Sequence, residues 1–543
     1  MGKIKKNQFI TFLLFIVFLL RIPTLFEPYW YGDEGIYLSI GYGLRHGLSL
    51  YKDLFDNKPP AIYLLSALAN GQIFWLRFFL DVSVLLTIYF FYQLAKNFFL
   101  KEKAARLATV FFAILTTLPL VEGNIANAEI FILLPTVFVF SVLTRVYFQE
   151  KKGVDKELTK QKMFVLGVIL GIGLLFKVTA FFDLAFLVLF LLFFREKKIQ
   201  LRNKLPRSKP ALSADRLTRY SGTSPEEFVS LSHSSVQQAG RYSASRNKGA
   251  VFGFLGGYFS PLLLCCLYFS LRGTFGDFWQ ACFVKTAGYL SSWQTGKHEF
   301  SLITLLKSEF SFRSLFLLLV ILFYFIQKKK ISPQALFVSL WLTFSLYAAT
   351  LSGRPYAHYL IQCLPAFCLC LPLIYFSVKQ KSQWKLVGVP LVILAWAIVR
   401  YQYWFYPSFS YYLNFKKFLL RERSKQEFFD HFNSKTSSVY KLAEIIQAYT
   451  PLKERIFIWA DEPYLYILSK RLPATRFLVA YHVIDLKQED KVSSQLNKNL
   501  PFLVVIDQNT KIFQELKNLV ANQYFLIWQE KSFLVFRRTK NNE

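Results

Sequence analysis

The sequence predicts a polytopic α-helical membrane protein that ends in a small extracytoplasmic α/β domain. Hydrophobic residues make up 54% of the 543 residues and charged residues only 18%, so the apolar surface exceeds what one water-soluble core can bury. The net charge is +31, but Lys and Arg lie in short groups between long apolar runs, as in the cytoplasmic loops of membrane proteins. This arrangement excludes a nucleic-acid-binding protein, a disordered chain and a disulfide-rich secreted scaffold.

The apolar runs predict about eleven membrane spans, because a hydrocarbon core about 30 Å thick needs roughly 20 apolar residues per helix. The first run, 9–26, follows three lysines and ends at Arg21-Ile22-Pro23 rather than at a small-residue cleavage site, so we expect it to be retained. A re-entrant hairpin is an alternative for the two short runs between 163 and 194. The remaining expected spans are 73–95, 104–121, 128–148, 163–178, 180–194, 250–271, 310–327, 333–351, 357–377 and 385–404.

The charges of the loops predict the orientation of the chain. Loops rich in Lys and Arg alternate with loops that carry fewer, and every basic loop falls on the same side as the N-terminus. Because basic loops remain in the cytoplasm, we expect a cytoplasmic N-terminus, an extracytoplasmic C-terminal part and a multi-pass location in the plasma (inner) membrane.

Two polar segments interrupt or follow the predicted transmembrane domain, 1–404. Residues 196–250 form a Ser-rich, basic cytoplasmic insert with too few aliphatic residues for a packed core. Residues 405–543 alternate between helix and strand patterns and predict the α/β domain. Its expected strands are 455–460, 501–506, 524–528 and 532–536, the last two as a hairpin, and its expected helices include 439–449 and 511–520.

The first outer loop, 27–72, holds the most informative polar residues. Asp33 and Glu34 lie in one acidic pair, and Asp56 and Lys58 follow about twenty residues later. A carboxylate at the membrane surface can take a proton from an acceptor hydroxyl, and a nearby Lys can stabilise negative charge on a departing phosphate. A structural alternative is that Asp33 caps a helix running from Glu34 toward Leu44.

Other ionisable residues border predicted spans, where they are costly and therefore functional candidates. Arg77, Glu129 and Lys177 lie near the outer ends, although Arg77 and Lys177 could instead extend to the membrane interface. Arg354 and His358 are four residues apart at the start of the tenth span. On a helix they would face one site, and a helix N-terminus favours an anion.

The order of these motifs resembles the membrane-embedded GT-C glycosyltransferases. Asp33-Glu34-Gly35-x-Tyr37, Tyr51-x-Asp53 and Lys58-Pro59-Pro60 are similar to the first outer loop of the bacterial relatives of the protein O-mannosyltransferases (glycosyltransferase family 39) and of the lipid A aminoarabinose transferases. Further similar segments are Trp75-Leu76-Arg77-Phe78, Asn127-Ala128-Glu129-x-Phe131, Gly171-x-Gly173-x-x-x-Phe176-Lys177, Gly353-Arg354-x-x-x-His358-Tyr359 and Trp459-Ala460-Asp461-Glu462-Pro463-Tyr464-x-Tyr466.

The resemblance implies a polyprenyl-phosphate sugar donor, transfer with inversion in the outer leaflet, and a glycan, lipid or protein as acceptor. By position in these motifs, Asp33 matches the general base, Glu34 its supporting acid and Lys58 the contact to the donor phosphate. The further candidates for phosphate or sugar contacts are Arg77, Arg354, His358, Tyr359, Asp56, Glu129 and Lys177. We expect no cofactor and no metal, since the His and acidic residues lack tight ligand spacing.

Three alternative functions remain open at this point. A flippase or transporter of lipid-linked sugars would place its ionisable residues near mid-span, whereas these gather at the outer ends. A polysaccharide polymerase or ligase would more typically carry a long outer loop later in the chain. A receptor role centred on the α/β domain is the third, and that domain is also our candidate for binding the acceptor.

Overall fold

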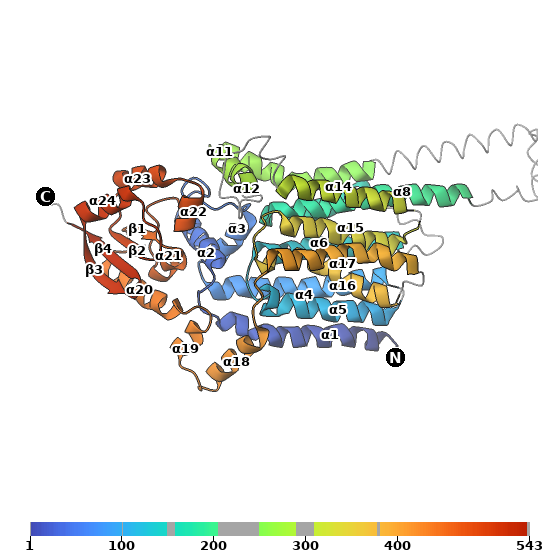
Figure 1. Cartoon of the computed structure of the whole chain (residues 1–543), viewed down its shortest axis with the longest axis horizontal. Coiled ribbons are helices and arrows are strands. Elements are labelled where there is room, and N and C mark those ends of the chain that lie inside the picture. The colour runs from blue at the N-terminus through green and yellow to red at the C-terminus, as the bar shows by residue number, and fades with distance from the viewer. Residues whose placement is uncertain are drawn as a thin grey trace, which may run out of the picture.

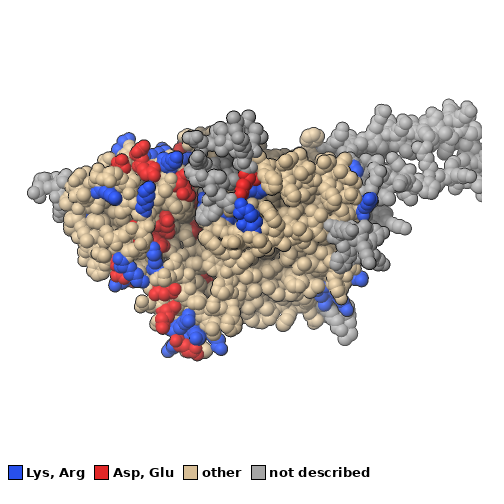
Figure 2. Space-filling view, in the orientation of Figure 1, with Lys and Arg blue, Asp and Glu red and all other residues tan. Residues whose placement is uncertain are grey.

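The computed structural model describes residues 2–99, 101–148, 158–204, 249–288, 309–328, 330–376 and 381–539. Figure 1 shows long helices running side by side in one bundle, with a domain at one end that contains the C-terminal strands. The N-terminus lies at the opposite end of the bundle. On the face shown in Figure 2, the side of the bundle is almost free of charged side chains, as expected of a surface that faces lipid.

Each predicted span coincides with a helix of the described chain. Within those residues, six helices are long and apolar enough to cross a membrane, and Val178–Leu192 and Leu386–Tyr401 are shorter apolar helices. The bundle helices are α1 (Gly2–Arg21), α4 (Ile73–Phe98), α5 (Glu102–Thr117), α6 (Ala128–Phe148), α7 (Lys160–Phe176), α8 (Phe181–Lys204), the helix Gly249–Leu271, α14 (Glu309–Gln327), α15 (Pro333–Thr350), η5 (Ala357–Cys363) continued by α16 (Leu364–Phe376), and α17 (Lys381–Tyr401).

The two short apolar runs predicted between 163 and 194 belong to two separate helices, and each helix is longer than its predicted run. α7 has 17 residues and α8 has 24, joined by the 3-10 turn η3 (Val178–Ala180). At 1.5 Å per residue α7 alone is about 26 Å long, close to the thickness of the hydrocarbon core. The predicted insert 196–250 lies mostly outside the described residues: α8 continues to Lys204, and the next helix begins at Gly249.

Small residues let α7 and the helix Gly249–Leu271 approach each other to backbone contact. A Cβ atom at Gly167 would overlap the carbonyl oxygen of Phe254, and one at Gly171 would overlap that of Tyr258. Helices in lipid associate through such close packing, because the hydrophobic effect does not drive apolar surfaces together there. The Gly-x-x-x-Gly spacing of α7 therefore positions this helix pair.

The first predicted outer loop contains two helices of its own, α2 (Gly32–Arg45) and α3 (Ala61–Leu68), after the 3-10 turn η1 (Ile22–Phe26). Figure 1 shows α2 and α3 between the bundle and the C-terminal strands. The alternative in which Asp33 caps α2 is wrong. Tyr31 is the N-cap residue, without a side-chain cap, and Asp33 lies inside the first turn.

The C-terminal sheet has the order β1-β2-β4-β3, with β1 parallel to β2 and the other pairs antiparallel. The four predicted strands and the final hairpin are confirmed, and both β1 and β2 are buried along their whole length. The elements are α18 (Ser408–Leu419), α19 (Lys425–Asp430), α20 (Thr436–Tyr449), β1 (Ile456–Trp459), α21 (Tyr464–Ser469), α22 (Ala480–Asp485), α23 (Glu489–Lys498), β2 (Leu503–Asp507), α24 (Gln514–Gln523), β3 (Tyr524–Glu530) and β4 (Phe533–Arg538).

A short helical segment braces the loop that carries Lys58. It consists of α11 (Phe275–Trp279), the π-helical turn η4 (Gln280–Val284) and α12 (Lys285–Gly288). The hydroxyl of Thr286 donates to the carbonyl of Asn57 at 3.1 Å, and the thiol of Cys282 lies 3.4 Å from the carbonyl of Lys58. These contacts fix the backbone on which the Lys58 side chain is mounted.

Candidate active site

A cavity of about 560 Å³ lies where the end of the bundle meets the C-terminal domain. The first outer loop, which includes α2, forms one wall of the cavity, and the ends of the bundle helices form its floor. The C-terminal domain supplies further polar groups. The charged residues and histidines that line it are Asp33, Asp56, Lys58, Glu122, Glu129, Lys177, Arg354, His358, Asp461, His482 and Asp485.

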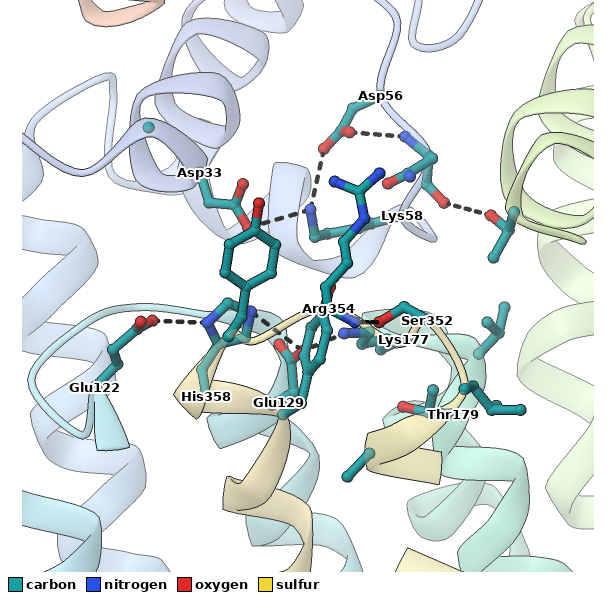
Figure 3. Close-up of a pocket in the computed structure, with 18 of the residues that line it drawn as sticks. Asp33, Asp56, Lys58, Glu122, Glu129, Lys177, Thr179, Ser352, Arg354 and His358 are labelled. Atoms are coloured by element: carbon teal, nitrogen blue, oxygen red, sulfur yellow. Dashed lines mark hydrogen bonds and ion pairs between the residues drawn. The ribbon is translucent and has the colours of Figure 1, made fainter. Parts of the chain in front are cut away.

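Asp33 and Lys58 form an ion pair in this cavity (Figure 3). The Nζ atom of Lys58 lies 3.4 Å from Oδ2 of Asp33, and the hydroxyl of Tyr37 donates to the same oxygen at 3.0 Å. Burial acts to raise the pKa of Asp33, but Lys58, His358 and the Tyr37 hydroxyl outweigh it and lower the pKa to about 2. The carboxylate is therefore charged near neutral pH and one quarter of it is exposed to the cavity.

Lys58 is held between two carboxylates. Its Nζ atom lies 3.7 Å from Oδ2 of Asp56 and 4.9 Å above the ring of Tyr37. Asp56 is itself fixed, because the hydroxyl of Tyr63 donates to Oδ2 at 2.7 Å. The Lys58 side chain is 15% exposed, so the cation is accessible from the cavity while its position is restrained.

The floor of the cavity is a chain of alternating charges from four segments of the bundle. Nδ1 of His358 lies 2.6 Å from Oε2 of Glu122, and Nε2 of the same ring lies 3.7 Å from Oε1 of Glu129. Glu129 also pairs with Lys177, whose Nζ lies 4.2 Å above the ring of Tyr359. Figure 3 shows this row of side chains directly below Asp33 and Lys58.

Arg354 reaches the cavity from a loop and not from a helix. It precedes η5, which begins at Ala357, so the expectation that Arg354 and His358 share the start of one helix is wrong. Figure 3 shows its side chain extending from that loop toward Lys58. Its Nη2 atom lies 3.7 Å from Oδ2 of Asp485, so this ion pair connects the bundle to the C-terminal domain across the cavity.

Glu34 and Arg77 do not line the cavity, although both were candidates for the site. Arg77 is fully buried and binds Glu34 through two nitrogens, at 2.6 and 3.1 Å, and Glu27 at 2.7 Å. Glu34 also accepts a hydrogen bond from the backbone N–H of Ala126 at 2.8 Å. Nor does Arg77 extend to the membrane interface. These groups instead hold the first turn of α2, which carries Asp33.

Among the charged and histidine residues of the cavity, Glu122, His482 and Asp485 have no counterpart among the motifs and candidates of the sequence. Glu122 has a left-handed backbone conformation (φ 61°), and its carboxylate accepts hydrogen bonds from Tyr31 and Asn127. His482 and Asp485 come from α22, more than 120 residues after the last predicted candidate. α22 has only six residues, and its packing against the first loop brings it to the cavity.

His482 is buried and faces the first loop. Its Nε2 atom lies 3.6 Å from Oδ1 of Asp56, and its ring packs edge-on against Phe55 at 5.5 Å. Burial lowers the pKa of His482 below its ordinary value, against the opposite effect of Asp56. In the part of the chain that the structure describes, no three His, Cys, Asp or Glu side chains are grouped to hold a metal ion.

Comparisons with known proteins agree with this architecture. A protein family described as dolichyl-phosphate-mannose-protein mannosyltransferase matches residues 46–208, and the C-terminal domain of the competence-induced protein Ccs4 matches residues 437–539. No curated protein matches the sequence significantly.

Among solved structures, ArnT from Cupriavidus metallidurans bound to undecaprenyl phosphate superposes with a TM-score of 0.55 at 13% identity, covering 98% of each chain. The apo structure of the same protein gives a TM-score of 0.50 at 12% identity, again over 98% of each chain. The resemblance to the GT-C group seen in the sequence is therefore confirmed, and the chain is a multi-pass membrane protein with the GT-C fold.

Proposed function

We propose that this protein is a membrane glycosyltransferase that moves a sugar from a polyprenyl-phosphate donor to an acceptor, with inversion at the anomeric carbon. The observation that carries the proposal is the Asp33–Lys58 pair, a carboxylate and a cation side by side in the cavity at the end of the bundle. Two comparisons support it: the fold resembles that of a protein bound to undecaprenyl phosphate, and the family that matches residues 46–208 is described as a dolichyl-phosphate-mannose-protein mannosyltransferase.

The proposed reaction needs one group that takes a proton and one that accepts negative charge. The acceptor oxygen attacks the anomeric carbon from the face opposite the phosphate, and the bond between that carbon and the phosphate oxygen breaks. The acceptor proton goes to the Asp33 carboxylate. The donor phosphodiester carries one negative charge and the departing polyprenyl phosphate carries two, so the new charge falls where Lys58 can stabilise it.

Donor binding would also activate the base. Lys58 pairs with Asp33 at 3.4 Å and is the strongest single influence that lowers the pKa of the carboxylate. A donor phosphate that binds Lys58 neutralises this charge, and the pKa of Asp33 then rises toward the range in which a carboxylate is a useful base. The ion pair would thus keep Asp33 a poor proton acceptor until the donor arrives.

Further cations in the cavity, each paired with a carboxylate, are suited to binding the donor phosphate. Lys177 and Arg354 each pair with a carboxylate, Glu129 and Asp485 respectively, and an incoming phosphate could exchange with either partner. His358 and Tyr359 lie beside Lys177, within reach of the same ligand. We assign Glu34 and Arg77 as positioning residues, since they hold the turn that carries Asp33 without lining the cavity.

In this proposed function the chain has two parts. Residues 1–404 form the transmembrane transferase with an extracytoplasmic cavity, and residues 405–543 form an extracytoplasmic domain that binds the acceptor. The contribution of Asp461, His482 and Asp485 to the lining supports this role, because these groups lie on the side of the cavity away from the bundle.

The test measures release of polyprenyl phosphate by purified protein from a panel of polyprenyl-phosphate sugars. Asp33→Asn keeps the size of the side chain and removes the base, so release should fall by about 10²–10⁴-fold while donor binding is retained. Asp53→Asn is the matched control: it is the same change in the same loop, at a residue that does not line the cavity.

Each outcome separates the candidate functions. Release from one donor that is lost in Asp33→Asn and kept in Asp53→Asn establishes the transferase and identifies its sugar. Equal release by the parent and Asp33→Asn refutes the assignment of the base. Binding without release by any form, even with an envelope extract as acceptor source, favours a transporter of lipid-linked sugars.

A further inference from the structure

The helix α18 exposes large apolar side chains outside the bundle. On the helix, Phe409 is 81% exposed and Leu419 59%, and Leu420, directly after the helix, is 57% exposed. The opposite side of α18 is anchored, because Tyr411 and Asn414 are buried. Exposed apolar residues gathered on one short segment mark an interaction surface.

The position of α18 identifies what this surface faces. The hydroxyl of Tyr412 donates to the carbonyl of Leu20 at 3.1 Å, and the rings of Phe415 and Phe26 lie 5.5 Å apart. α18 therefore sits at the end of α1, as Figure 1 also shows. The side of α1 exposes Phe12 and Phe15, at 66% and 56%, so the apolar surface of α18 continues the surface that contacts lipid.

The charge around α18 is predominantly basic. Lys416 is exposed and Lys417 partly exposed, and Figure 2 shows charged side chains gathered on this corner of the molecule. Exposed Phe and Leu together with Lys are the residues by which an interfacial helix binds a membrane surface, with the lysines extended to the headgroups. The residues 416–427 comprise the basic Lys416, Lys417, Arg421, Arg423 and Lys425 and the acidic Glu422 and Glu427.

We propose that α18 is a membrane-surface anchor: Phe409, Leu419 and Leu420 enter the boundary of the acyl chains, and Lys416 and Lys417 bind the headgroups of anionic phospholipids. The occupant of this surface is the bilayer and not a protein partner, because the surface is continuous with the lipid-facing side of α1 and its charge complements an anionic headgroup.

The anchor adjoins the residues that hold the candidate active site. The hydroxyl of Tyr411, on the buried side of α18, donates to Oε1 of Glu27 at 2.6 Å. Glu27 in turn pairs with Arg77, which binds Glu34 in the first turn of α2. A lipid contact at α18 is thus connected through three buried side chains to the turn that carries Asp33.

The test places the photo-crosslinker p-benzoyl-phenylalanine at position 409 of the full chain in nanodiscs of phosphatidylcholine and phosphatidylglycerol. Mass spectrometry after illumination identifies the lipid adducts. The same label at position 525 is the matched control, since Phe525 is also exposed (48%) but lies on β3, at the far end of the C-terminal domain. We expect lipid adducts at position 409 and none at 525.

The lysines are tested in the labelled protein. Each basic residue near a membrane surface favours an anionic lipid by about fivefold, so phosphatidylglycerol should be enriched among the adducts, and Lys416→Gln with Lys417→Gln should remove most of that enrichment. Adducts at both labelled positions, or at neither, overturn the anchor. Lipid adducts at 409 with equal yields from the two lipids overturn the headgroup assignment. Because the side chain at position 409 is mostly exposed, the label should not disturb folding. Monodisperse elution of each variant excludes misfolding.

Discussion

Replacing Lys58 with Met tests the electrostatic coupling on which the proposed mechanism depends. Methionine keeps the length and the apolar stem of the side chain and removes the positive charge that lies 3.4 Å from Asp33. After burial, Lys58 is the largest influence on the pKa of Asp33, and it acts to lower it. Without Lys58, fewer groups counteract the effect of burial, so the pKa of Asp33 must rise.

The size of the rise follows from the two reference values. The pKa of Asp33 is about 2 in the folded protein, against 3.8 for an unperturbed Asp. A return to the unperturbed value raises the pKa by about 2, equivalent to about 2–3 kcal/mol. Because burial still disfavours the charged form, we expect the pKa in Lys58→Met to reach or exceed 3.8.

The assay is the pH dependence of kcat/KM for donor cleavage, which reports the ionisation of the free enzyme. A general base works only when it is deprotonated, so activity falls as the pH drops through its pKa. In the parent, Asp33 stays ionised down to about pH 3, whereas in Lys58→Met the acid limb should move up by about 2 pH units or more. The comparison uses the position of the limb, which does not depend on how much activity the variant retains.

Two results would refute this reasoning. An acid limb at the same pH in parent and Lys58→Met would show that Lys58 does not set the pKa of Asp33. The same upward shift in Lys52→Met would show a general effect of charge, since Lys52 is exposed in the same loop and does not line the cavity.

Three further predictions concern residues whose roles the tertiary structure defines. Arg77→Met leaves the carboxylates of Glu27 and Glu34 buried without their cation, so the free energy of unfolding should fall by about 3–5 kcal/mol in a denaturant titration. Gly167→Leu forces a side chain into the backbone of the neighbouring helix and should cost about 1–3 kcal/mol in the same titration. His482→Phe should lower transfer to acceptors in an envelope extract by about tenfold, through the loss of one polar contact, while donor cleavage with water is retained.

Matched variants control these three measurements. Arg106→Met breaks a half-exposed pair with Glu102 and should cost less than about 1 kcal/mol. Gly256→Leu lies on the helix that packs against α7, but nothing occupies the space around it. His431→Phe changes a histidine of the C-terminal part that does not line the cavity. Equal effects in a variant and its control would contradict the corresponding prediction.

The membrane spans, the strands of the C-terminal domain and the pair Asp33 and Lys58 are predictable from the sequence alone. These features are local: an apolar run of about 20 residues must cross a bilayer as a helix, and a short buried run of β-branched and aromatic residues forms a strand. Asp33 and Lys58 were recognisable because both lie in one polar loop and in motifs of known order. Their direct contact at 3.4 Å is consistent with that expectation.

Which of the other charges share the cavity depends on how the helices and the C-terminal domain pack. Arg77 and Lys177 look alike in the sequence, as single cations at the ends of spans, yet Arg77 is buried between Glu27 and Glu34 while Lys177 lines the cavity with Glu129. A buried charge is stable only with a partner, and the partner comes from whichever segment the packing brings near. For the same reason His482, far along the chain, reaches Asp56 only because the C-terminal domain folds back over the first loop.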